Sequence, residues 1–196
     1  MRRQLTLRCL KICMFSMLSL WLFGCTSSPH IEENVTYYIF DANPLPQTTE
    51  HASNLTPVNI AAVKLPRYLS GDHLIMQSQD HSFVRANYHS WADNLDAAIK
   101  RAIISDVNQA NSKFYAVNKC QTCTSITVHI EHFYPTDGGD ILLSGYTEQN
   151  SGNSENKITR FYYKTALESA GYANAVKQMR KQVSLLTKDV LKSLDK

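Results

Sequence analysis

Two cysteines and two histidines in the middle of the chain stand at spacings that could hold a metal ion. They are Cys120, Cys123, His129 and His132. Thiolates and imidazoles are the common ligands of zinc, and a Cys-x2-Cys pair followed by two histidines is one of its ligand patterns. Both histidines, however, fall on one expected strand, Ser125–Tyr134, three positions apart, so they point to opposite faces. They reach one ion only across a bulge, and we therefore expect no metal.

The same two cysteines can react with each other instead. In an oxidising compartment we expect Cys120 and Cys123 to form a local disulfide. Free thiols and a redox dithiol are the alternatives. A redox pair of the thioredoxin type opens a helix after a strand, whereas this pair stands just before a strand, which favours the disulfide.

A different cysteine chemistry is indicated at Cys25. Basic residues ending at Lys11 come first, and the apolar run Ile12–Phe23 follows. That run has about 12 residues, where a membrane-spanning helix needs roughly 20, so it is the core of a signal peptide. Leu22-Phe23-Gly24-Cys25 resembles the lipobox of bacterial lipoproteins, in which the bond before the cysteine is cut and its thiol receives diacylglycerol.

The lipobox resemblance implies how the chain is organised. Residues 1–24 are the signal peptide, residues 25–36 a lipidated tether, and residues 37–196 the folded domain. Acylated Cys25, carrying diacylglycerol and palmitate, is the membrane attachment. Thr26, where inner-membrane retention would use Asp, implies an outer-membrane protein that faces the periplasm. An ordinary secretory signal with an incidental Cys25, and a short N-terminal membrane anchor, are the alternatives.

Charge and composition exclude several functions. Four of the 20 basic residues lie before Cys25, and the remaining 16 face 17 acidic residues, so the mature chain carries about −1. Its basic isoelectric point therefore gives no support for nucleic-acid binding. Neither a phosphate loop nor a Gly-x-Ser-x-Gly motif occurs, and the seven histidines are scattered. We expect no enzyme, no catalytic residue and no cofactor.

The residues are positioned by an α+β fold. Strands are expected at 37–40, 58–64, 74–77, 83–88, 114–117, 125–134, 141–148 and 157–167, from β-rich or alternating patterns. The pairs 74–77 with 83–88 and 125–134 with 141–148 read as hairpins, and 157–167 completes a three-stranded meander. The expected architecture is one domain, a mostly antiparallel sheet with two amphipathic helices packed on one face.

Two segments have helical periodicity. In the first, Ser90 and Asp93 are spaced like a capping box. An apolar face follows to about Asn108, made of Trp91, Leu95, Ala98, Ile99, Ala102, Ile103 and Val107. The second runs from Tyr172 to Leu194 with apolar residues at spacings of three and four and a basic opposite side, Lys177, Arg180, Lys181, Lys188 and Lys192.

Several short blocks, in order, are shared with a known family. They are Tyr37-Tyr38-Ile39, Val63–Asp72, Ile75-Met76-Gln77, Trp91–Leu95, Thr127–Ile130, Ser144-Gly145 and Gly171-Tyr172. Together they resemble the ABC-type transport auxiliary lipoproteins. The resemblance covers nearly the whole mature chain, through the order and spacing of the blocks. The chain departs from the family in its pair Cys120/Cys123 and in its loops 43–57 and 149–156.

The resemblance implies a non-catalytic accessory of an intermembrane lipid transport system. Such proteins work with MCE-domain proteins and face the periplasm, and some are ring-like homo-oligomers. The implied partners are an MCE-domain protein and the membrane, with phospholipid and a second copy left open. The alternative function is a structural or assembly lipoprotein of another envelope or secretion machine.

The block Val63–Asp72 also has a physical interpretation that does not depend on the family resemblance. Pro66 ends a strand and Gly71 permits a sharp turn, so Arg67, Tyr68 and Leu69 are presented on a loop. We expect these three to form a partner or oligomer contact. The alternative is a purely structural corner between two strands.

Overall fold

Three consecutive antiparallel strands form one side of the larger sheet. They are β6 (Thr124–Pro135), β7 (Asp140–Asn150) and β8 (Lys157–Ala166). In the first half of β6, Ile126, Val128 and Ile130 are buried and the residues between them are not, as the alternation predicts for a half-buried strand. Gly139 closes the turn between β6 and β7 with a φ of +80°, an angle that favours glycine. The predicted meander is confirmed.

The structure is a computed structural model that describes residues 34–40, 54–78, 81–110, 112–152 and 156–195. From Asn34 onward the chain forms one compact unit. Cys25, the predicted signal peptide and most of the predicted tether lie outside the described residues.

Parallel strands complete the larger sheet. β2 (Thr56–Lys64) lies between β5 (Phe114–Val117) and β6, parallel to both, in the order β5-β2-β6-β7-β8. Both strands are where the sequence predicts them. Their parallel pairing joins segments about 60 residues apart in the chain, so no local pattern announces it.

A second, smaller sheet has the order β1-β4-β3. The predicted hairpin pairs β3 (His73–Gln77) with β4 (Phe83–Trp91), and β1 (Thr36–Tyr38) runs parallel to the last residues of β4. A bridge from Gln77 to Thr136 links this sheet to the turn after β6. The antiparallel pairings remain the longest ones in the fold.

The capping box predicted at Ser90 is wrong. Ser90 and Trp91 are the last residues of β4, and helix α2 (Leu95–Gln109) begins after Asn94. The cause is the pairing with β1, which keeps the backbone extended as far as Ala92, whose N–H donates to the Tyr38 carbonyl oxygen at 2.9 Å. The rest of the predicted apolar face, from Leu95 to Val107, is buried as expected.

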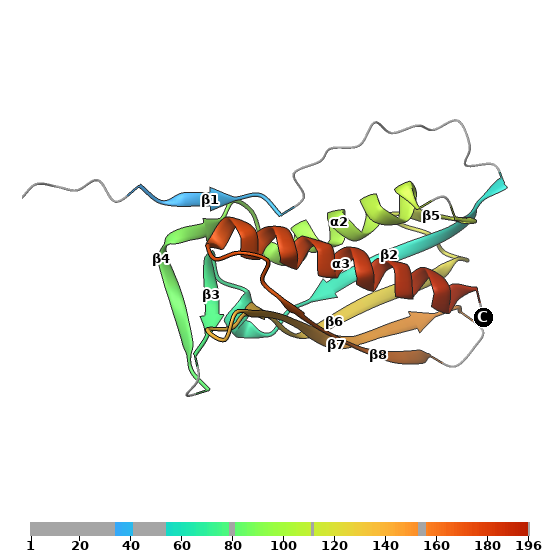
Figure 1. Ribbon diagram of the computed structural model, residues 1–196. Coiled ribbons are helices and arrows are strands. Elements are labelled where there is room, and N and C mark those ends of the chain that lie inside the picture. The colour runs from blue at the N-terminus through green and yellow to red at the C-terminus, as the bar shows by residue number, and fades with distance from the viewer. Residues whose placement is uncertain (1–33, 41–53, 79–80, 111, 153–155, 196) are drawn as a thin grey trace, which may run out of the picture. The chain divides into compact units, whose positions relative to one another are not determined.

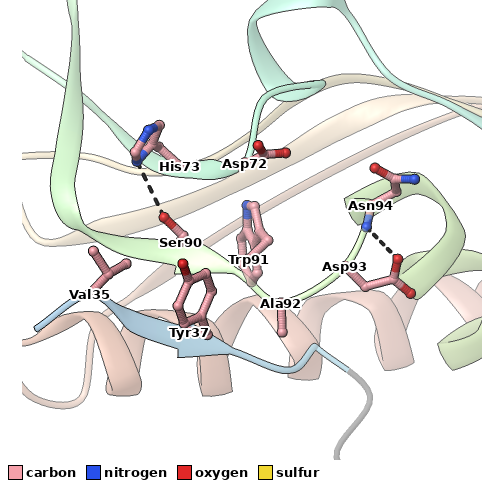
Figure 2. A pocket seen from close by; sticks show the side chains of 9 residues that line it. All are labelled: Val35, Tyr37, Asp72, His73, Ser90, Trp91, Ala92, Asp93 and Asn94. Atoms are coloured by element: carbon pink, nitrogen blue, oxygen red, sulfur yellow. Dashed lines mark hydrogen bonds between the residues drawn. The ribbon is translucent and has the colours of Figure 1, made fainter.

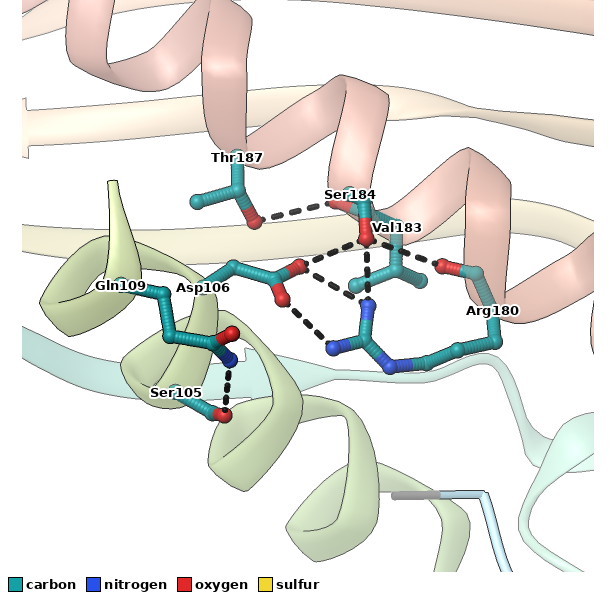
Figure 3. A network of polar contacts seen from close by, with 7 residues as sticks. All are labelled: Ser105, Asp106, Gln109, Arg180, Val183, Ser184 and Thr187. Carbon is teal, nitrogen blue, oxygen red and sulfur yellow. Dashed lines mark hydrogen bonds and ion pairs between the residues drawn. The ribbon is translucent and has the colours of Figure 1, made fainter. Parts of the chain in front are cut away.

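Helix α3 (Tyr172–Leu194) confirms the second predicted helix. Figure 1 shows α2 and α3 side by side over one face of the larger sheet. Between them, Asp106 of α2 accepts two hydrogen bonds from Arg180 of α3, at 2.5 and 2.8 Å, and one from Ser184 at 2.9 Å (Figure 3). Arg180 therefore clamps α2 to α3, although the sequence pattern groups it with the lysines on the side of the helix opposite the apolar face.

The described residues thus form a single α+β domain with two α-helices and eight strands in two mixed sheets, which confirms the predicted class. Neither α2 nor α3 nor any other helix in the described ranges is long and apolar enough to cross a membrane.

Candidate functional site

Three of the shared blocks of the sequence meet around a hollow of about 480 Å³ at the junction of β1, β3, β4 and α2. Figure 2 shows its lining residues, which are Val35, Tyr37, Asp72, His73, Ser90, Trp91, Ala92, Asp93 and Asn94. Tyr37 comes from β1, His73 is the first residue of β3, and Asp72 directly precedes it. The sequence predicted none of these as a site. Six of the nine lie in shared blocks, whereas Val35, His73 and Ser90 lie in none.

A serine and a histidine face each other in this hollow. The Ser90 hydroxyl lies 3.3 Å from Nδ1 of His73. A nucleophilic serine needs a base that a third group orients, and Figure 2 shows the Asp72 carboxylate turned away from the His73 ring. Ser90 is also only 4% exposed. The pair therefore has the geometry of a structural link between β3 and β4.

Asp93 organises the start of α2 at the rim of the hollow. Its carboxylate accepts the backbone N–H of Asn94 at 2.7 Å and pairs with Arg101 at 2.8 Å. The backbone hydrogen bond, followed by the Arg101 contact, lowers the pKa of Asp93 below its usual value. The carboxylate is therefore ionised at neutral pH and already has partners within the chain.

The predicted contact residues lie on the 3₁₀ turn η3 (Arg67–Leu69). Arg67 is exposed, whereas Leu69 is 4% exposed and belongs to the core. The ring of Tyr68 stacks on Phe83 with centroids 4.7 Å apart, and its hydroxyl donates to the Glu131 carbonyl oxygen. Leu69 is thus unavailable as a direct contact, and the contact at Arg67 and Tyr68 stays a prediction.

Burial is the main cause of a raised pKa at Tyr68. Together with the neighbouring Tyr134 and Glu131, it raises the pKa of Tyr68 to about 12. The phenol therefore keeps its proton at physiological pH and continues to donate to β6.

Tyr68 belongs to an aromatic cluster that the sequence did not predict. Phe83 packs edge-on against Tyr134, with centroids 5.0 Å apart. Phe83 and its neighbour Val84 are nevertheless 42% and 49% exposed. Arg67, Tyr68 and Phe83 form what we call the η3 surface, a partly exposed aromatic surface beside one cation. Val84, the next residue of the strand, points to the opposite face. Arg67 and Tyr68 were predicted as a contact, and only the apolar residues of a predicted hairpin hinted at Phe83.

The two cysteines lie close together before β6. Their Cα atoms are 5.7 Å apart and the structure pairs their sulfurs, a spacing that a disulfide accepts. The N–H of Cys123 also points to the sulfur of Cys120 at 3.0 Å. The disulfide stays a prediction, with its test given in the Discussion.

The two histidines of the zinc-like pattern are separated by a bulge that the sequence did not reveal. The register of β6 shifts between Ile130 and His132. His129 stacks on Tyr146 with centroids 4.4 Å apart, and Nδ1 of His132 lies 3.0 Å from the Tyr134 hydroxyl. In the part of the chain that the structure describes, no three His, Cys, Asp or Glu side chains are grouped to hold a metal ion.

The domain matches a known protein family and two of its named relatives. Residues 38–191 match the family described as ABC-type transport auxiliary lipoprotein component. The chain is 25% identical over 129 residues to the intermembrane transport lipoprotein PqiC of Escherichia coli, covering 65% of this chain and 67% of that protein. The PqiC of Shigella flexneri matches equally well.

Solved structures share the fold. The crystal structure of an uncharacterized protein has a TM-score of 0.71 at 18% identity and covers 82% of this chain and 99% of its own. The crystal structure of a protein from Xanthomonas campestris has a TM-score of 0.60 at 9% identity, with 80% and 90% covered. Since the family match spans β2 to β8, the η3 surface, α2 and most of α3, this chain belongs to the ABC-type transport auxiliary lipoproteins and has an accessory role in transport.

Proposed function

We propose that this chain is a non-catalytic accessory of an intermembrane lipid transport system, held in the outer membrane by acylated Cys25 and facing the periplasm. The observation that carries the proposal is the extent of the family match, because residues 38–191 leave only a short tether between the folded domain and Cys25. The PqiC relatives, named as intermembrane transport lipoproteins, support the class of transport.

An MCE-domain protein is the proposed partner, and the η3 surface is the proposed contact. Exposed apolar side chains gathered beside one cation are typical of protein interfaces, where Tyr and Arg contribute strongly. Arg67 has no ion-pair partner among the described residues, so its charge is available to an acidic group. The side chain of Tyr68 is fixed by its hydrogen bond to the Glu131 carbonyl oxygen and by stacking on Phe83. Little side-chain conformational freedom is therefore lost on binding.

A non-catalytic role is supported by the hollow itself. Its one Ser–His pair lacks an orienting carboxylate, and the Asp93 carboxylate is occupied by Asn94 and Arg101. A hydrolase would need a free nucleophile beside an oriented base.

We also propose that copies of this chain associate. β8 is an edge strand of the larger sheet, and its Ile158 and Tyr162 are 64% and 66% exposed. An exposed edge with large apolar side chains readily pairs with another chain. Light scattering on the lipid-free domain should give a mass above that of one chain, and replacing Tyr162 with Glu should lower it.

Mild crosslinking in cells followed by purification tests the partner. We expect an MCE-domain protein among the captured proteins. Recovery of only secretion-machine or peptidoglycan proteins would support instead the alternative of a structural or assembly lipoprotein.

Fractionation of the variant Cys25→Ala tests the anchor. The variant should be released from the membrane fraction as a soluble periplasmic protein. Unchanged membrane attachment would overturn the role of Cys25, and recovery of the unaltered chain in the inner membrane would overturn the proposed location.

A further inference from the structure

The first strand of the domain presents an apolar stripe to solvent. Val35, Tyr37 and Ile39 are 39%, 66% and 62% exposed. Residues two positions apart in extended chain lie on one face, so the three side chains form a row, which we call the β1 stripe. Exposed apolar residues that are contiguous indicate a binding surface more strongly than scattered ones.

The alternate residues of the same segment are held inward. Phe40 is 3% exposed and packs edge-on against Trp91 and Phe133, each at 5.9 Å between centroids. The Tyr38 hydroxyl lies 2.9 Å from Nδ1 of His89. Since this face is fixed to the core, the β1 stripe cannot turn inward without breaking these contacts.

The length of chain before the β1 stripe limits what can cover it. Val35 lies ten positions after Cys25, and a fully extended chain spans at most about 36 Å over ten steps. If Cys25 is acylated, the β1 stripe is therefore confined near the bilayer at a high effective concentration. Tyrosine is also one of the residues that favour the boundary between lipid and water.

We propose that the β1 stripe is a second membrane contact, lying in the interface of the bilayer that holds Cys25. This inference rests on the proposed lipid anchor. A peptide strand added to the edge of β1 fits less well, because the strand itself has only three residues, Thr36–Tyr38, and offers few backbone groups. The adjoining hollow is lined by Asp72 and Asp93 and by no Lys or Arg, so the contact is apolar and does not depend on anionic lipid.

The contact would orient the domain. β1 pairs with the end of β4, at His89–Trp91, while Phe83 and Val84 lie at its other end. The six residue steps from Val84 to Ser90 span about 20 Å of strand. A membrane at β1 therefore leaves the η3 surface displaced along β4, away from the point of attachment.

Site-specific fluorescence on the mature, lipidated chain in phosphatidylcholine vesicles tests this. A cysteine replacing Tyr37 carries the fluorophore NBD, and Cys120 and Cys123 are replaced by Ser so that no other thiol reacts. The control is Lys188→Cys on α3, because Lys188 is exposed and lies outside every proposed contact surface. Nitroxide-bearing lipid quenches a probe in the interface, and aqueous iodide quenches one in water.

We expect nitroxide lipid to quench the probe at position 37 about threefold more than the probe at 188, at low and high salt alike and without anionic lipid. Equal quenching at both positions on vesicle-bound protein overturns the contact and leaves the anchor intact. Protection at position 37 from both quenchers also overturns it, since protein then covers β1. If the chain fails to float with the vesicles, the anchor fails and the inference with it.

Discussion

The clamp between the two helices gives a prediction whose size can be worked from the structure. Replacing Asp106 with Ala removes three hydrogen bonds, two from Arg180 and one from Ser184. The side chains of Asp106 and Arg180 are only 15% and 25% exposed, so the variant leaves a cation partly buried without its partner. Breaking such a pair costs about 3 kcal/mol of the free energy of unfolding.

A double-mutant cycle measures the interaction energy between Asp106 and Arg180 apart from the other contacts that each side chain makes. Asp106→Ala, Arg180→Ala and the double variant, all in the lipid-free domain, should show a coupling energy of about 2 kcal/mol in urea unfolding. For a domain of this size the single variant Asp106→Ala should lower the melting temperature by about 6 to 12 °C.

An exposed ion pair of similar length is the control. Lys113 and Asp195 lie 2.6 Å apart with side chains 62% and 53% exposed, and their cycle should give a coupling below about 0.5 kcal/mol because solvent screens them. A coupling between Asp106 and Arg180 as small as that of the control would refute the reasoning that this contact clamps α2 to α3.

Three further predictions concern Gly145, the cysteine pair before β6, and Asp189. Gly145→Ala should destabilise the domain by about 3 kcal/mol in urea unfolding, because the added Cβ would collide with a main-chain oxygen of β6; an unchanged midpoint would contradict this. Cys120 and Cys123 in periplasmic protein should resist maleimide until a reductant is added, whereas labelling beforehand would show free thiols. A hydrogen bond from Tyr163 lowers the pKa of Asp189 below its usual value of 3.8. The ionised Asp189 side chain therefore stabilises the folded domain above that pH, and this contribution is lost as the pH falls further. Asp189→Asn should therefore flatten the acid side of the stability–pH curve, and an unchanged slope would count against it.

The sequence could predict the elements whose patterns are local. The alternation around Val128, the turn at Gly138 and Gly139, and the periodicity after Tyr172 each announce one element and its buried face. These patterns are short-range consequences of half-buried strands and one-sided helices.

The misses share a physical cause, since each depends on a distant partner. Ser90 looks like a helix cap until β1 pairs beside it and holds it extended. Leu69 looks like a loop residue until the core closes over it. The link from Asp106 to Arg180 joins positions 74 residues apart, so neither residue stands out within its own helix.

The candidate site was predicted even less completely. Three of the blocks shared with the family supply six residues of the hollow, but nothing in the sequence says that these blocks meet. The η3 surface was predicted in part, through Arg67 and Tyr68, but its exposed Phe83 comes from a separate hairpin. Surfaces built from two segments carry no periodic signal, so sequence reasoning finds one half at best.

Photocrosslinking in living cells directly tests whether the η3 surface binds an MCE-domain protein. A photoreactive amino acid takes the place of Arg67 or, as the control, of the exposed Lys188 on α3. We predict that the probe at position 67 captures an MCE-domain protein and that the probe at 188 does not. Capture of only other envelope proteins from position 67, with the chain correctly at the membrane, would contradict the account.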